Sequence, residues 1–232
     1  MRVLRIFMLA ALAAAISACA SSTPEFQTGP DAEVTHDGLT RLDKTIMDGV
    51  WARTDIDLTS YSKVMFKGVG VEYRAVTGPY SGRAGTGSTW SSRSSRDEFQ
   101  LDDKTKAMFE EEIADAFREE ISKSSVFEVV DEPGPDVLMV VGGLLDVVSR
   151  VPPEQIGRGA IFIDRVGEAT LVLEVRDSQT NAIFARAVDR RAAERTGQMM
   201  ESNTVTNRTE VRRLGRRWGQ ILRDGLDRLL SE

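Results

Sequence analysis

The stretch GEATLVLEVR at residues 167–176, followed by DSQTN at 177–181 and AIFARAVDRR at 182–191, decides the fold more than any other part of the chain. In the first piece every second residue is apolar: Ala169, Leu171, Leu173 and Val175. A period of two is typical of a strand that buries one face, and the short polar middle piece is typical of a turn. We therefore predict a hairpin of two antiparallel strands, Ala160–Arg176 and Ala182–Arg191.

Three more strands are predicted from short apolar or β-branched runs, at Ser62–Tyr73, Phe127–Val130 and Val137–Val148. Two amphipathic helices are predicted at Asp102–Lys123 and Thr209–Leu230, because apolar residues recur there every three or four positions. Strands outnumber helices, and two of them form a hairpin. We expect an α+β fold, with a mostly antiparallel or mixed sheet of about five strands and two helices packed on one face.

The two predicted helices carry opposite charges. Acidic residues line the outer face of the first helix: Glu110, Glu111, Asp115, Glu119 and Glu120. Arginines crowd the last helix, most densely at Arg212, Arg213, Arg216 and Arg217, and others precede it at Arg190, Arg191 and Arg195. Such a patch could bind anionic lipid head groups or an acidic partner. The alternative is an ordinary solvated helix face, with some arginines paired to the acidic helix.

The first 20 residues predict export and lipid attachment. Arg2 and Arg5 precede a ten-residue apolar run, a length that fits a secretory signal and is too short to span a bilayer. The run leads into Ile16-Ser17-Ala18-Cys19, which resembles the lipobox of bacterial lipoproteins and contains the only cysteine of the chain. We expect residues 1–18 to be a signal peptide and Cys19 to carry the lipid. Ala20 follows the cysteine; by resemblance to enterobacterial lipoprotein sorting, a residue other than Asp at this position implies the outer membrane, facing the periplasm.

The rest of the exported chain divides into a tether and a domain. Residues 19–35 are rich in small polar residues and proline, which predicts a flexible tether. Residues 36–232 are expected to form a single α+β domain, in which residues 36–60 could pack as an arm. Two polar loops, 77–97 and 149–159, are candidate binding segments, because rigid scaffolds often present function on loops.

Composition excludes several classes of function. His36 and Cys19 are the only histidine and cysteine, so histidine-based triads, a cysteine nucleophile and Cys/His zinc sites are not expected. We predict no catalytic residues, no metal and no cofactor. Without residues 1–18 the chain has 28 basic and 36 acidic residues, a formal charge of −8. An acidic exported protein is a poor candidate for nucleic-acid binding. The sequence leaves the oligomeric state open.

Several segments resemble a family of bacterial lipoproteins known as the domain of unknown function 3313. The resemblance rests on the stretch 127–138, FEVVDEPGPDVL, on 167–169 and 174–180, and on 187–191, AVDRR. Tyr61–Met65 and the Trp218-containing last helix also fit, so the resemblance covers about residues 38–230. It implies a cell-envelope lipoprotein and supplies no catalytic residues.

Two functional hypotheses remain. The first is a non-enzymatic binding or accessory module of the cell envelope, anchored to the membrane through Cys19 and binding an envelope protein or a glycan. The second is a carboxylate-dependent hydrolase acting on an envelope polymer, which would need two suitably spaced acids in a cleft. The sequence contains many acids but no motif that selects a pair.

Overall fold

The computed structural model describes residues 23–76, 98–152, 160–195 and 198–231. The predicted signal peptide, Cys19, the loop 77–97 and most of the loop 149–159 lie outside these residues. Within them, no helix is long and apolar enough to cross a membrane. The elements are, in chain order, β1 (Glu25–Phe26), β2 (Thr40–Asp43), β3 (Gly49–Ala52), β4 (Lys63–Tyr73), α2 (Asp103–Ile121), β5 (Glu128–Val129), β6 (Val137–Ser149), β7 (Phe162–Ile163), β8 (Arg165–Asp177), β9 (Ile183–Glu194), β10 (Met200–Glu201) and α3 (Thr204–Ser231).

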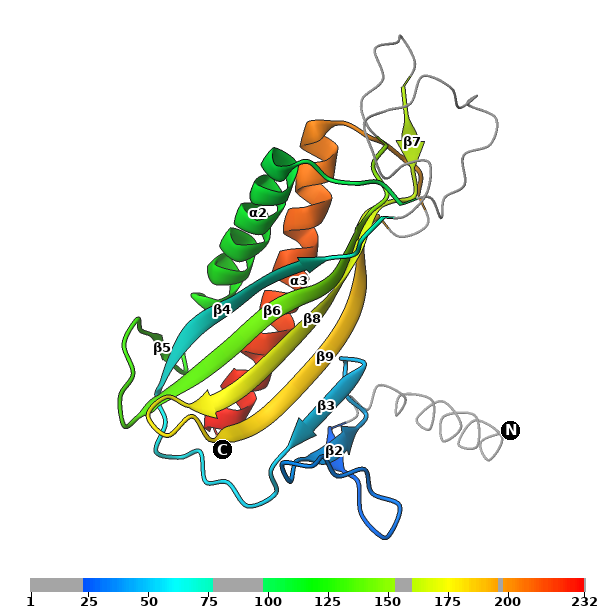
Figure 1. Cartoon of the computed structure of the whole chain (residues 1–232). Helices are drawn as coiled ribbons and strands as arrows, with labels where there is room; N and C mark the ends of the chain where they lie inside the picture. The colour runs from blue at the N-terminus through cyan, green and yellow to red at the C-terminus, as the bar shows by residue number, and fades with distance from the viewer. Residues whose placement is uncertain (1–22, 77–97, 153–159, 196–197, 232) are drawn as a thin grey trace, which may run out of the picture.

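One large mixed sheet forms the body of the molecule, with α2 and α3 side by side on one of its faces (Figure 1). The strand order is β1-β2-β3-β9-β8-β6-β4-β5. The pairs β4–β6 and β4–β5 are parallel, and the other pairs in this sheet are antiparallel. The predicted α+β class, the mixed sheet and the position of the helices are confirmed.

The predicted number of about five strands is wrong, because the described residues already place eight strands in the large sheet. The extra strands are β1, β2 and β3, which are only two to four residues long and too short to show a hydrophobic period. They add an edge to the sheet through the pairing of β3 with β9. The residues 36–60, expected as an arm, thus contribute strands. The segment predicted as a tether also contains regular structure, since β1 pairs with β2.

Two predicted boundaries shift for local reasons. The strand expected at Ala160–Arg176 is two strands: β7 pairs with β10 in a separate small sheet, and β8 begins at Arg165. The last helix begins at Thr204, five residues before the expected start. Asn203 explains this start, because its side-chain oxygen accepts a hydrogen bond from the Thr206 amide at 2.9 Å, as an N-cap residue does.

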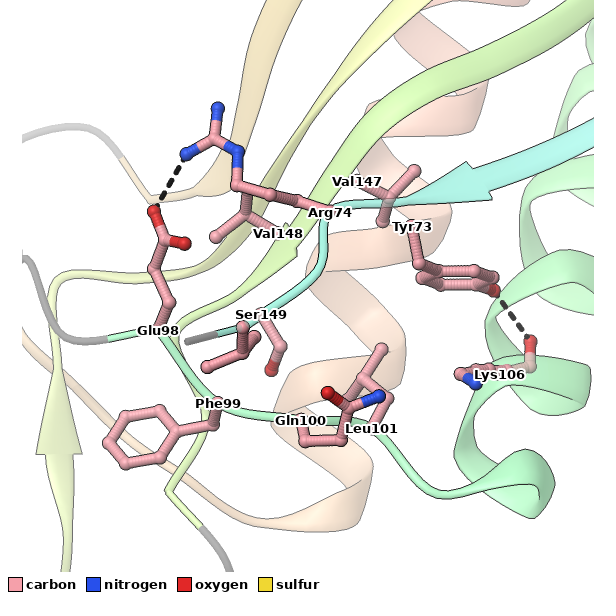
Figure 2. Close-up of a pocket in the computed structure, with 11 residues that line it drawn as sticks. Tyr73, Arg74, Glu98, Phe99, Gln100, Leu101, Lys106, Val147, Val148 and Ser149 are labelled. Carbon is pink, nitrogen blue, oxygen red and sulfur yellow. Dashed lines mark hydrogen bonds and ion pairs between the residues drawn. The ribbon is translucent and has the colours of Figure 1, made fainter. Parts of the chain in front are cut away.

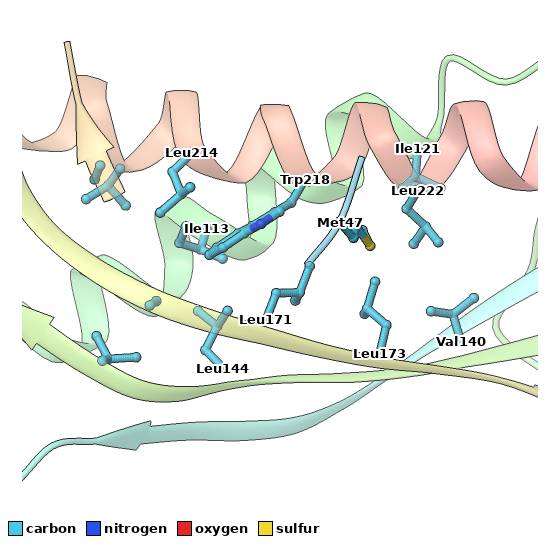
Figure 3. Close-up of a cluster of buried hydrophobic side chains, with 14 of the residues drawn as sticks. Met47, Ile113, Ile121, Val140, Leu144, Leu171, Leu173, Leu214, Trp218 and Leu222 are labelled. Carbon is cyan, nitrogen blue, oxygen red and sulfur yellow. The ribbon is translucent and has the colours of Figure 1, made fainter. Parts of the chain in front are cut away.

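The core lies between the helices and the sheet. The alternating residues of β8 point toward the helices, as predicted, and pack against Leu214, Trp218 and Leu222 of α3. Figure 3 shows Met47, from the turn between β2 and β3, lying beside Trp218 under α3. Trp218 is fully buried. The short N-terminal strands are therefore held to the domain by an apolar side chain as well as by sheet pairing.

Glycines allow α2 and α3 to approach closely. A side chain at Gly215 would meet the Cβ of Ala116 at 3.0 Å, and one at Gly219 would meet the Cβ of Glu120 at 2.8 Å. Gly215 and Gly219 are one helical turn apart, so both face α2. This small-residue stripe brings the acidic side of α2 within reach of the arginines of α3.

Asp177 organises the β8–β9 turn. Its carboxylate accepts hydrogen bonds from the amides of Gln179 and Thr180, the Thr180 hydroxyl and the Tyr61 hydroxyl, the last at 2.7 Å. These bonds to the ionised form lower the pKa of Asp177 to about 2. Tyr61 links this turn to the start of β4, so one carboxylate joins segments that are distant in sequence.

This arrangement predicts a pH dependence of stability. The folded pKa of Asp177 lies below its unfolded value, so its contribution is present above about pH 4 and is lost as the pH falls toward 2. We expect Asp177→Asn, which keeps the shape but cannot ionise, to lower the free energy of unfolding by about 1–2 kcal/mol at pH 7. Urea denaturation at several pH values should show this difference shrinking between pH 5 and pH 2. A difference that stays constant over this range would contradict the assignment.

Candidate binding surface

The structure separates the four arginines of the predicted anionic-partner patch into two pairs. Arg212 and Arg216 face α2, where Arg212 lies 2.7 Å and Arg216 3.2 Å from carboxylate oxygens of Glu119. Arg212 also contacts Glu112, 3.3 Å away. These contacts lower the pKa of Glu119, mainly through the hydrogen bond from Arg212. Arg212 and Arg216 therefore pair with the acidic helix, as in the alternative interpretation.

Arg213 and Arg217 lie on a different side of α3, beside β9. Together with β9 they border a surface depression with a cavity volume of about 200 Å³. We call it the α3–β9 depression. The described residues that line it come from two elements: Arg191, Ala192 and Glu194 of β9, and Glu210, Arg213, Leu214 and Arg217 of α3.

Positive charge exceeds negative charge around the α3–β9 depression. Glu210 is completely buried as a side chain, and it accepts from both Arg195, at 3.2 Å, and Arg213, at 2.6 Å. Two guanidinium groups therefore share one carboxylate. Arg217 is exposed, and it makes no ion pair with any of the residues that the structure describes. The uncompensated charge lies at the rim, where a ligand can reach it.

The floor beside the depression is fixed by a buried carboxylate. Asp189 of β9 is 1% exposed and accepts a hydrogen bond from the Trp218 indole nitrogen at 2.7 Å. Arg191 pairs with the same carboxylate and also donates to the Ile46 carbonyl at 3.1 Å. The Asp48 amide completes the group, 3.3 Å from Asp189. Arg191 is thereby held in place, while Arg217 stays available.

A second hollow lies at the far end of β4 and β6, near the start of α2. It has a volume of about 10 Å³, which is the size of a single water molecule. Figure 2 shows its lining, with Arg74 paired to Glu98 on one side and Tyr73 bonded to Lys106 on the other. As bounded by the described residues, this hollow is too small to hold an organic ligand.

In the described part of the chain, several pairs of acids share one arginine. Asp146 and Glu168 are one such pair, since both bind Arg190, at 2.7 and 3.1 Å. Their pKa values are lowered, Asp146 chiefly by its hydrogen bond from Arg74, and Glu168 by Arg150 and Arg190 against the opposing effect of burial. A general acid requires a raised pKa. In the described part of the chain, every carboxyl group with a displaced pKa is shifted downward.

Metal binding gains no support from the described residues, which contain no group of three or more His, Asp and Glu side chains placed to hold an ion. His36 is exposed, near the N-terminal strands. Sequence reasoning identified Arg213 and Arg217, but it missed the buried Glu210 and the participation of β9. A glutamate within an arginine-rich helix gives no signal of burial; the three arginines before the helix were the available clue.

The family model for a protein of unknown function, DUF3313, matches residues 35–222 of the sequence. The chain belongs to the DUF3313 family. No curated protein matches the DUF3313 chain. The predicted resemblance is thus confirmed over nearly the whole described domain.

Several solved structures are similar to the DUF3313 chain at low identity. Protein XCC0632 from Xanthomonas campestris, of the DUF330 family, has 11% identity and a TM-score of 0.41, with 77% of this chain and 90% of that chain covered. A minor lipoprotein from Acinetobacter baumannii has 12% identity and a TM-score of 0.33, with 72% and 93% covered. A putative neuraminyllactose-binding hemagglutinin homolog from Helicobacter pylori has 11% identity and a TM-score of 0.33, with 76% and 86% covered.

Proposed function

We propose that this DUF3313 protein is a lipid-anchored lipoprotein of the cell envelope, and that it works as a non-enzymatic module binding an anionic partner in the α3–β9 depression. The observation that carries the proposal is the exposed Arg217 beside two arginines that share the single carboxylate of Glu210. An exposed excess of positive charge attracts anionic ligands and steers their approach.

The rest of the chain supports binding over hydrolysis. The chain is acidic as a whole, with a formal net charge of −6, so a local positive surface is not a consequence of general composition. Asp146 and Glu168, two acids that share Arg190, are paired with arginines that keep them ionised. Such residues stabilise a fold but donate protons poorly at neutral pH.

Anchoring through Cys19 is the part of the proposal that rests on sequence alone. The lipobox-like Ile16–Cys19 follows a short apolar run, and two or more acyl chains give a stable anchor where one chain alone binds only marginally. Ala20, the residue after the cysteine, is the basis for proposing that the anchor lies in the outer membrane and that the domain faces the periplasm.

Loss of the thiol should release the protein from the membrane. We expect Cys19→Ser to abolish incorporation of radiolabelled palmitate and to move the protein from the membrane fraction to the soluble fraction. Ser17→Ala, which keeps a small residue before the cysteine, is the matched control and should remain membrane-bound. A Cys19→Ser protein that stays fully membrane-associated and labelled would show that the anchor lies elsewhere.

Charge reversal tests the binding surface. We expect Arg217→Glu to weaken binding of the full chain to poly-glutamate about tenfold at low salt, because a like charge then faces the ligand. Arg216→Glu changes the net charge equally but lies on the α2 side, beside Glu119. It should leave the affinity within about twofold. Fluorescence anisotropy measures both affinities. Equal effects of the two variants would mean that the net charge of the protein, and not the α3–β9 depression, determines polyanion binding.

A further inference from the structure

The edge of β9 is open along the α3–β9 depression. β3 pairs with β9 only from Ala185 to Val188, whereas β9 continues to Glu194 (Figure 1). Beyond Val188, the Arg190 amide donates to the Asp48 carboxylate at 2.8 Å, on the side of β9 where β3 lies. Past this contact, no described strand pairs with that edge of β9.

Strand geometry fixes which groups this edge presents. Alternate residues of a strand direct their N–H and C=O groups to the same side, so Ala192 and Glu194 point theirs in the direction of the Arg190 amide. Both residues line the α3–β9 depression, and the intervening Ala193 does not. Ala193 instead packs in the core. The depression therefore has a wall made of backbone donors and acceptors.

An open strand edge is a template for pairing with another extended segment. Proteins often protect such an edge with proline or charged side chains. Residues 191–194, Arg-Ala-Ala-Glu, contain no proline, and the charge of Arg191 is held by Asp189. Glu194 is the residue on this stretch whose charge would repel an acidic ligand. Arg165, 3.7 Å from its carboxylate, offsets that charge. The other wall of the depression is the arginine-bearing side of α3, with Arg213 and Arg217.

We propose that an extended acidic peptide segment of a partner protein adds to the edge of β9 at Ala192 and Glu194, with its carboxylates directed at Arg217 and Arg213. This inference rests on the proposed function and names the class of partner. Backbone pairing would give affinity, and the alternating side chains of the segment would give specificity. The volume of about 200 Å³ leaves room for the few side chains of a short segment, not for a folded surface.

A peptide fits this site better than a phosphate or a lipid head group does. A phosphate oxygen accepts hydrogen bonds from an arginine or an amide, but it satisfies no backbone carbonyl. The wall at Ala192 and Glu194 presents both N–H and C=O groups. An extended peptide complements both kinds of group, and its acidic side chains complement the arginines as well.

The test uses the full chain in detergent and a seven-residue peptide of alternating valine and glutamate with blocked ends. A matched peptide carries N-methyl groups on its edge-facing amides, so it keeps the charge but cannot pair as a strand. We expect the N-methylated peptide to bind at least tenfold more weakly than the parent peptide. We also expect the parent peptide to slow hydrogen exchange at the Ala192 and Glu194 amides. Ala192→Pro removes one outward N–H of the protein, and it should weaken binding of the parent peptide by a similar factor.

The outcomes separate this inference from the proposed function. Equal affinities of the two peptides, with no protection at Ala192 and Glu194, would overturn strand addition. If Arg217→Glu still weakened poly-glutamate binding selectively, the proposed anion-binding function would remain supported while strand addition would be rejected. Phosphatidylglycerol vesicles form the third arm: Arg217-dependent binding to vesicles, with no binding of either peptide, would overturn the peptide assignment in favour of a lipid. Selective loss with N-methylation and protection of both amides would establish strand addition.

Discussion

Replacing Trp218 with alanine is expected to lower the free energy of unfolding by about 3–5 kcal/mol, the range for removing a large aromatic side chain from a core. Trp218 is 0% exposed and lies between α3 and the sheet, beside Met47 and Leu214 (Figure 3). Its removal leaves a cavity under the helix and frees the turn between β2 and β3. Urea denaturation followed by circular dichroism measures the effect.

Trp218→Phe is the matched control for this prediction. Phenylalanine keeps most of the buried apolar area but loses the hydrogen bond from the indole nitrogen to Asp189. We expect a smaller loss, about 1–3 kcal/mol, from leaving a buried acceptor short of one donor. If alanine cost no more than phenylalanine, Trp218 would contribute a hydrogen bond and little packing, contrary to this account.

Asp189→Ala is the second large effect, expected at about 3–5 kcal/mol, because breaking a buried ion pair leaves the remaining charge uncompensated. Three donors lose their acceptor together: the Trp218 indole, the Arg191 guanidinium and the Asp48 amide. The same variant should loosen the N-terminal strands, since Asp48 and Ile46 are held through this group. Hydrogen exchange of the β3 amides, measured against the amides of β6, reports that loosening.

Asp189→Asn and a double variant sharpen this second prediction. Asparagine keeps the shape and one acceptor oxygen, so it should cost clearly less than alanine. Because Trp218 and Asp189 contact each other, the combined Trp218→Phe and Asp189→Ala variant should cost less than the sum of the two single variants. Additive costs would show that the two side chains act independently, and an alanine cost below about 1 kcal/mol would remove Asp189 from its central role.

Long periodic segments made most of the fold predictable. The hairpin of β8 and β9 follows from the alternation at 169–175 and the turn at 177–181, and α2 begins at Asp103, one residue after the expected start. The short strands β1, β2 and β3 were not predictable in this way, because two to four residues carry no period. These strands form because β3 pairs with β9 and because Met47 packs into the core. Both are contacts between segments distant in sequence, which the local pattern does not reveal.

The candidate site was half predictable. Arginine density identified Arg212, Arg213, Arg216 and Arg217, but sequence alone did not divide them between two sides of α3. The division depends on where α2 lies, and Gly215 and Gly219 set that contact. The burial of Glu210 depends on how α3 packs beside Arg195 and Arg213. The open edge of β9 depends on how far β3 extends along β9, and β3 is too short to detect from sequence.

The most direct test of the central claim is crosslinking in cells from a photoreactive amino acid placed at position 217 or, as the matched control, at position 216. The two positions are adjacent and exposed, but only the first borders the α3–β9 depression. The account predicts that position 217 forms adducts that mass spectrometry maps to an acidic segment of an envelope protein, and that position 216 does not. Equal adducts from both positions, or adducts from position 217 to segments without acidic residues, would contradict it.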